Sequence, residues 1–132
     1  MYRRRGTRVR SAFTLIELLV VVVVIGILAA IAISKFRNTK GKAFYASVRS
    51  DLQNLATAEE AFFYEARLYS ANLDSVKAVR SPGVILTVHE ASATGWSASG
   101  YHPSSWPRTC AIFFGNAAPV TPATDAGTVA CN

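Results

Sequence analysis

Glu17 is the residue in this sequence whose surroundings most require a partner of opposite charge. It lies in the apolar run Phe13–Ile33, whose 21 residues contain two polar side chains, Thr14 and Glu17. A carboxylate in hydrocarbon costs about 2.5 kcal/mol or more on membrane-insertion scales. Glu17 is close to one end of the run, so its side chain could simply reach the membrane interface. Alternatively, it pairs with a cation from another chain, since a buried acid and a buried amine relieve each other's desolvation only when close together.

Cys110 and Cys131 are the two cysteines, and they allow two interpretations. They are either two unrelated buried thiols or the two halves of a disulfide. If the C-terminal part lies outside the cytoplasmic membrane, the oxidising surroundings favour the disulfide. Such a bond would enclose about 20 residues and stabilise the fold by roughly 3 kcal/mol in the loop-entropy estimate.

His89 and His102 are the remaining side chains that could bind a metal or transfer protons near neutral pH. Neither stands at zinc-site spacing from the cysteines, and the sequence has no Gly-rich phosphate loop and no nucleophile elbow. Asp125 is the one acidic residue after Glu90, and one carboxylate is too few for a typical calcium cage. We therefore expect no enzymatic activity, no metal and no cofactor, and we expect His89 on the outer face of a strand.

The apolar run is long enough to cross a membrane as one helix. At about 1.5 Å per residue, its 21 residues span roughly 30 Å, the thickness of the hydrocarbon core of a bilayer. Residues 13–33 are therefore predicted to form a membrane-inserted helix. Two alternatives are a cleaved secretory signal, for which Ala29-Ala30 and Ala32 could mimic the cleavage site, and a plain single-pass anchor. A secretory signal fits less well, because its apolar core is shorter and because four basic residues follow this run closely.

Positive charge is concentrated at the start of the chain. Lys and Arg number 14 and Asp and Glu number 8, so the net charge of +6 invites an interpretation as nucleic-acid binding. Five of the cations lie in the first ten residues, with no acid among them. Without residues 1–12, 9 basic side chains face 8 acidic ones, a net charge of +1. Most of the basic signal therefore belongs to a leader, and nucleic-acid binding is possible but not indicated.

The segment Ser11-Ala12-Phe13-Thr14-Leu15-Ile16-Glu17, followed by the apolar run, resembles the prepilin signal of type IV pilins and type II secretion pseudopilins. The resemblance implies that a membrane aspartyl peptidase cuts between Ala12 and Phe13 and methylates the new N-terminus, Phe13. It also implies that Glu17 pairs with the Phe13 amine of a neighbouring subunit during filament assembly. The sequence departs from the family pattern at Ala12, where Gly is usual, and at Ser34, where many pilins have Pro.

The remainder of the chain predicts an α+β fold. Residues 34–70 are expected to continue the membrane segment as an amphipathic helix that ends near Tyr69, since apolar residues recur at steps of three and four. This stripe consists of Phe44, Val48, Leu52, Leu55, Ala58, Phe62 and Ala66.

Residues 71–132 are expected to form a small antiparallel sheet of about three to four strands, covered by the helix stripe. Strands are predicted over 83–90, 96–102 and 109–115, with 116–132 as an exposed loop ending. The resemblance to type IV pilins also implies a C-terminal disulfide loop, here formed by Cys110 and Cys131. Major pseudopilins usually lack that loop and bind calcium instead.

Charge along the predicted helix is segregated. A basic stretch from Lys35 to Arg49 precedes an acidic stretch that contains Asp51, Glu59, Glu60 and Glu65. One interpretation is a solvated face whose basic end lies near anionic lipid. The other is that staggered neighbours place the two stretches side by side, in which case charge reversal at Glu59 and Glu60 would impair filaments and leave the monomer folded.

Together these features predict the precursor of a small structural subunit, a major or minor pilin of a type IV pilus-like filament. Its expected partners are copies of itself, a prepilin peptidase, a pilus assembly platform and, before assembly, the inner membrane. Its expected location is the inner membrane and then the cell surface, with the C-terminal part outside the cytoplasm. The alternatives are a type II secretion pseudopilin in a periplasmic pseudopilus and, less favoured, a plain membrane-anchored binding domain. The disulfide pair argues mildly against the pseudopilin.

Overall fold

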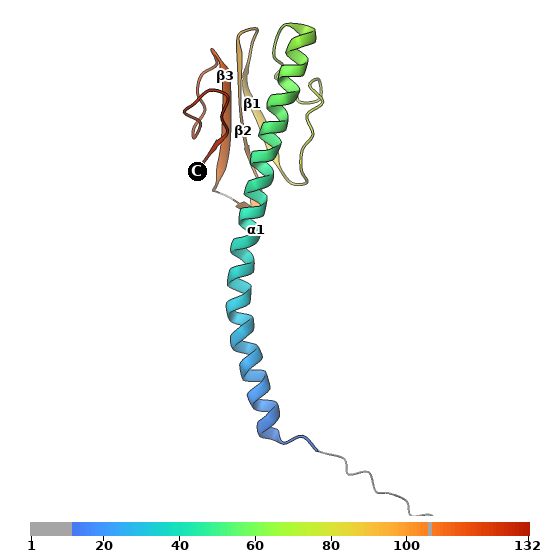
Figure 1. Ribbon diagram of the computed structural model, residues 1–132, viewed down its shortest axis with the longest axis vertical. Helices are drawn as coiled ribbons and strands as arrows, with labels where there is room; N and C mark the ends of the chain where they lie inside the picture. The colour runs from blue at the N-terminus through green and yellow to red at the C-terminus, as the bar shows by residue number, and fades with distance from the viewer. Residues whose placement is uncertain (1–11, 106) are drawn as a thin grey trace, which may run out of the picture. The chain divides into compact units, whose positions relative to one another are not determined.

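The computed structural model describes residues 12–105 and 107–132, with the backbone alone for Asn38. The predicted leader, residues 1–12, therefore lies outside the described residues except for Ala12. Contacts divide the chain into two compact units, one ending at Arg37 and the other comprising Asn38–Asn132. The elements, in chain order, are α1 (Leu15–Ala66), β1 (Ile85–Ala91), β2 (Gly95–Tyr101), a short 3-10 helix (Pro103–Ser105), β3 (Thr109–Gly115) and β4 (Ala130–Cys131) (Figure 1).

The apolar run is helical, and its side chains are exposed. Every large apolar side chain from Leu15 to Ile33 is at least 47% exposed. A helix satisfies its backbone hydrogen bonds internally, so this segment needs no sheet partner even though it is rich in Val. Among the described residues, α1 is long and apolar enough to cross a membrane.

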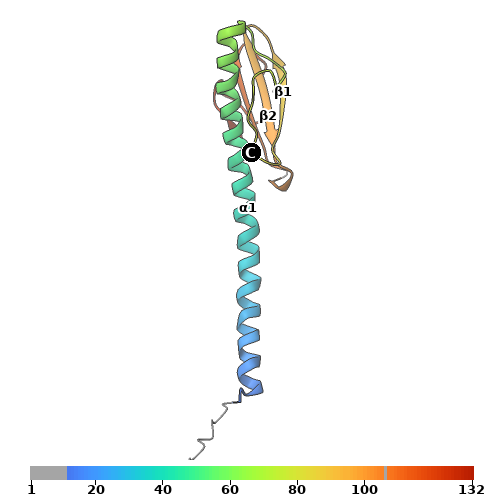
Figure 2. The ribbon, with the colours of Figure 1, turned by 90° about the vertical axis from the view of Figure 1, so that its right-hand side faces the viewer.

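In the second unit, α1 lies against one face of the sheet, as the two views agree (Figures 1 and 2). The sheet has the order β1-β2-β3-β4, and all neighbours are antiparallel. Val48, Leu52 and Leu55 from the predicted helix stripe are buried in the core. They pack with buried sheet residues that include Leu86, Trp96, Ala98, Cys110 and Ile112. The α+β fold, with one long helix covering a small antiparallel sheet, is confirmed.

The helix ends at Ala66, three residues before the predicted end near Tyr69. Arg67 adopts a left-handed conformation with φ of 60°, which is a common way to terminate a helix. Tyr69 then donates its backbone N–H to Ser92 O at 2.9 Å, and its ring is buried in the core. Extension of α1 to Tyr69 would remove this aromatic ring from the core.

The prediction that residues 116–132 form an exposed loop ending is wrong in part. Ala130 and Cys131 pair with Ala111 and Cys110 as the fourth strand. Three small or apolar side chains of the segment, Ala117, Ala123 and Val129, are buried. The segment is therefore a packed return of the chain, which ends against β3.

Candidate functional site

Thr14 and Glu17 form a reciprocal cap at the start of α1. The Thr14 backbone N–H and its hydroxyl both donate to Glu17 Oε2 at 2.8 Å, and the Glu17 N–H donates to Thr14 Oγ1 at 3.3 Å. This is a capping box, in which a Thr before the helix and a Glu three residues later satisfy backbone donors that the helix leaves free. The Thr-x-x-Glu spacing is visible in the sequence, but the helix cap was not among the roles predicted for Glu17.

Glu17 also lines an apolar surface groove. The groove has a volume of about 390 Å³ and is lined by Phe13, Ile16, Glu17, Val20 and Val21. Phe13 is 81% exposed and precedes the helix, as does Ala12. The structure thus places Ala12, Phe13 and Glu17 together at one exposed helix end. Since both donors from Thr14 go to Oε2, Oε1 is the Glu17 oxygen that neither of them uses.

A second group of carboxylates on α1 holds the segment that connects the helix to the sheet. Asp51 accepts the Ser81 backbone N–H at 2.6 Å and the Ser81 hydroxyl at 2.9 Å. Glu59 accepts the Ser70 backbone N–H at 3.0 Å, and Glu60 accepts the Tyr69 hydroxyl at 3.0 Å. Asp51 therefore fastens one end of the segment from Tyr69 to Ser81, and Glu59 and Glu60 fasten the other.

These contacts correct the interpretation of the acidic stretch as a solvated face or a purely intermolecular surface. Asp51 is 3% exposed and Glu59 is completely buried. Charge reversal at Glu59 would place a cation in the core, so the predicted folded monomer with altered filaments does not follow for that residue. Of the four acidic residues, Glu60 and Glu65 have exposed side chains.

Burial changes the acid–base properties of this cluster. Desolvation raises the pKa of Glu59 above its ordinary value, against the lowering effect of the Ser70 N–H bond, and the negative charge of Glu60 raises it further. Glu59 Oε1 has no hydrogen-bond partner among the described residues. Desolvation and the hydrogen bond to Glu60 raise the pKa of Tyr69 to about 12, so Tyr69 is a neutral donor at physiological pH.

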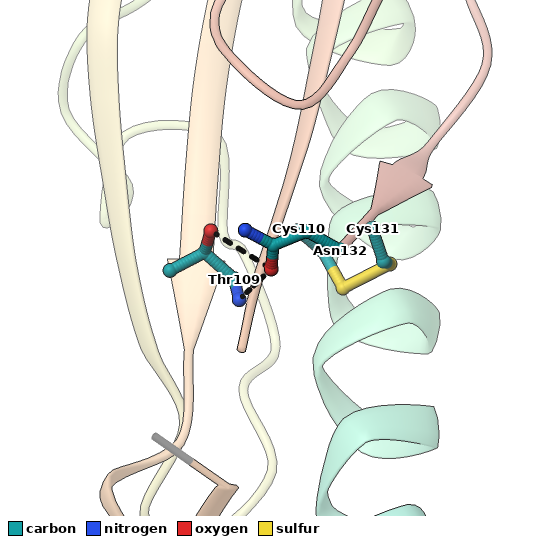
Figure 3. The surroundings of a disulfide bond; sticks show 4 residues. All are labelled: Thr109, Cys110, Cys131 and Asn132. Atoms are coloured by element: carbon teal, nitrogen blue, oxygen red, sulfur yellow. Dashed lines mark hydrogen bonds between the residues drawn. A yellow bond between two sulfur atoms is a disulfide. The ribbon is translucent and has the colours of Figure 1, made fainter. Parts of the chain in front are cut away.

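The structure joins Cys110 and Cys131 in a disulfide between directly paired strand positions of β3 and β4, with the Cα atoms 4.1 Å apart (Figure 3). Asn132 reinforces the junction. Its Oδ1 accepts the Thr109 backbone N–H at 2.8 Å, and its own N–H donates to Thr109 O at 3.2 Å. The last residues of the chain are therefore fixed covalently and by hydrogen bonds to the start of β3.

The two histidines lie in different environments. His89 is exposed on β1, as expected, and its Nε2 is 2.7 Å from Ser99 Oγ. His102 is buried, stacks on Phe44 at 4.0 Å between ring centroids, and accepts the Ser104 N–H at Nδ1. Gly83 is required beside this ring, because its φ is +82° and an added Cβ would contact His102 Nε2. Residues 12–105 and 107–132 hold no cluster of three or more potential metal ligands.

Two comparisons with known proteins bear on the N-terminal motif. The family described as the prokaryotic N-terminal methylation motif matches residues 7–33. The type IV major pilin protein PilA of Myxococcus xanthus (strain DK1622) is 47% identical over 58 residues, which are 44% of this chain and 26% of that protein. The chain thus aligns with about a quarter of the length of that relative.

The chain carries the prokaryotic N-terminal methylation motif and is similar to a type IV major pilin over 58 residues. Both comparisons support the resemblance to type IV pilins seen in the sequence. The matched methylation motif contains Ala12, Phe13 and Glu17, which are the residues that the prepilin resemblance assigned to processing and assembly. The capping box and the apolar groove lie within the same matched motif.

Proposed function

We propose that the chain is the precursor of a structural subunit of a type IV pilus-like filament. The methylation-motif match over residues 7–33, which includes the exposed apolar part of α1 from Leu15 to Ile33, is the observation that carries this proposal. An apolar surface of this size needs cover, either from lipid or from apolar helices of neighbouring copies. Lipid holds the subunit before assembly, and neighbouring helices replace lipid in the filament.

Processing creates the cation that Glu17 needs. A prepilin peptidase in the inner membrane cuts between Ala12 and Phe13 and N-methylates Phe13, whose amine then carries a positive charge. In the filament this amine approaches Glu17 Oε1 of a neighbouring subunit, within the groove lined by Phe13, Ile16 and Val20. Pairing offsets the cost of a carboxylate among apolar helices, whereas an unpaired Glu17 would disfavour that packing. The Thr14 cap orients the carboxylate before the partner arrives.

The topology follows from the same residues. The basic leader stays in the cytoplasm, the apolar segment of residues 13–33 lies in the inner membrane, and residues 38–132 lie outside the cytoplasm. There the Cys110–Cys131 disulfide persists under oxidising conditions. A pilus assembly platform then moves the subunit from the membrane into a filament at the cell surface.

The test is mass spectrometry of the mature protein together with electron microscopy of filaments. We expect an N-methylated Phe13 terminus and surface filaments that contain the chain. Glu17→Ala should abolish filaments and leave the protein in the membrane, whereas Glu17→Asp, which keeps a carboxylate, should retain some assembly. An intact Met1, or a terminus beyond Ala29, would refute the proposal, and short periplasmic filaments would identify a pseudopilin instead.

A further inference from the structure

A pocket opens between α1 and the sheet on the side of Glu60. It has a volume of about 220 Å³, and α1 contributes Ala56, Thr57 and Glu60 to its lining. The sheet contributes Trp96, Ile112 and Phe114, and the C-terminal segment contributes Gly127. Phe114 is 40% exposed although it is a large aromatic residue. The pocket therefore presents apolar and aromatic walls with one carboxylate among them.

This combination of groups recognises a cation that carries apolar carbon next to it. A guanidinium stacks on aromatic faces and forms hydrogen bonds to a carboxylate, which ammonium groups do less well. Glu60 already accepts the Tyr69 hydroxyl through Oε1, so its carboxylate is oriented before any ligand arrives. Tyr69 in turn contacts Phe114 edge to face, with ring centroids 6.2 Å apart.

A complementary surface lies elsewhere on the same chain, in the segment Lys77–Arg80. Val79 is 74% exposed, and Lys77 and Arg80 beside it are exposed cations. The segment is fastened at both ends, since Ala78 N–H donates to Leu73 O at 2.9 Å and Ser81 is held by Asp51. An exposed Val next to an exposed Arg, on a segment with fixed ends, suits the apolar and acidic pocket in both hydropathy and charge.

The two surfaces lie on opposite flanks of α1. Asp51, which holds the segment, and Glu60, which lines the pocket, are nine residues apart, which is two and a half turns of an α-helix. In Figure 1 the yellow-green segment near residues 70–80 lies on one side of α1, and β3 lies on the other. Two different surfaces on opposite flanks make a heterologous contact, which can repeat from copy to copy without closing.

We propose that the segment Lys77–Arg80 of one subunit docks into the Glu60 pocket of the next, with the Arg80 guanidinium on the Glu60 carboxylate and Val79 against Phe114. The proposal rests on the proposed filament function and adds the pair of surfaces that join the subunits outside the apolar helix. It replaces the earlier hypothesis of a basic helix stretch facing an acidic one, because Glu60 retains an exposed carboxylate whereas Asp51 and Glu59 are buried.

Cross-linking tests the contact directly. The two cysteines of the chain are both in the native disulfide, so Thr57→Cys at the pocket rim and Val79→Cys on the segment add the only free thiols. Filaments of the double variant, oxidised with diamide, should give a ladder of multimers on non-reducing gels, with the 57–79 cross-link identified by peptide mapping. Each single variant should lack the ladder. Filaments of the double variant that stay monomeric, or that link 57 to 57 or 79 to 79, would overturn the proposal.

Charge removal provides a second test that does not need new thiols. Glu60→Gln keeps an oxygen acceptor for Tyr69 and removes the charge, and Arg80→Gln removes the partner charge. Each should reduce filament yield several-fold at an unchanged level of folded, disulfide-bonded subunit, and the double variant should lose no more than either single one. Glu65→Gln, another exposed acid on α1, is the matched control and should assemble normally.

The two proposals fail in different ways. If the wild-type chain forms no filaments, the proposed function fails and this contact fails with it. The contact alone is refuted if filaments form but Glu60→Gln and Arg80→Gln assemble like the wild type. It is also refuted if the losses of filament yield in the two single variants add in the double variant.

Discussion

Glu59 is completely buried, and its carboxylate accepts the backbone N–H of Ser70 at 3.0 Å across an interval of 11 residues. A buried ionised carboxylate with one hydrogen bond is a costly group, because the protein interior solvates charge far less well than water. The groups that face it are the Ser70 N–H and the negatively charged Glu60. Burial and Glu60 both favour the protonated form, and Ser70 opposes them.

This relationship predicts a pH dependence of stability. The pKa of Glu59 in the folded chain is raised above its ordinary value of 4.5, so above that pH the folded state holds a proton that the unfolded state has released. The stabilisation from Glu59 is therefore fully present below pH 4.5 and is lost as the pH rises through the raised pKa. Glu59→Gln stays neutral and keeps an acceptor for Ser70. It should therefore remove the contribution of Glu59 to the slope of the free energy of unfolding against pH.

The measurement is urea unfolding of the full chain in detergent micelles between pH 4.5 and 7.5, followed by tryptophan fluorescence. Glu65→Gln, at an exposed position, is the control and should keep the wild-type slope. If Glu59→Gln and the wild type show the same slope, Glu59 is not the group responsible.

The Asp51–Ser81 pair should contribute more to stability than a surface hydrogen bond. Asp51→Ala leaves the Ser81 N–H without its acceptor and should lower the free energy of unfolding by about 2 kcal/mol. Ser81→Ala removes one of the two hydrogen bonds and should cost about 1 kcal/mol. A double-mutant cycle should then give a coupling between the two residues, and additive losses would contradict a direct interaction.

The fold could be predicted because its signals are local. The spacing of Val48, Leu52 and Leu55 identified the buried face of the helix, and the predicted strand over 109–115 has the bounds of β3. Each of these inferences depends on neighbours within a few residues, where periodicity carries the information.

The carboxylate contacts could not be predicted in the same way, because their partners are distant in sequence. Asp51 is bound by Ser81, 30 residues away, and a charged residue outside an apolar stripe gives no sign of burial. Strand β4 could not be predicted for another reason. Two residues, Ala130 and Cys131, are too few to show a period, and their pairing with β3 depends on the position of Cys110.

Removal of the disulfide should destabilise the second unit and loosen the return of the chain after β3. The cross-link spans a sequence separation of 21 residues. Its loss should cost about 3 kcal/mol in the loop-entropy estimate. Cys110→Ala with Cys131→Ala avoids free thiols, and hydrogen exchange should show faster exchange at Gly127 and Ala123, whose N–H groups donate to Phe113 O and Val120 O. Unchanged exchange there would mean that the Asn132–Thr109 hydrogen bonds suffice to hold the segment.

The Thr14–Glu17 capping box should control order at the first turn of α1. Thr14→Val keeps the shape of the side chain but removes the hydroxyl that donates to Glu17 Oε2 and accepts the Glu17 N–H. Loss of a cap of this kind costs about 1 kcal/mol, so amide exchange should accelerate at residues 15–18 in detergent micelles, while residues 48–55 stay protected. Thr14→Ser retains the hydroxyl and should behave like the wild type. If Thr14→Val also leaves exchange unchanged, the first turn is held by the apolar surroundings and not by its cap.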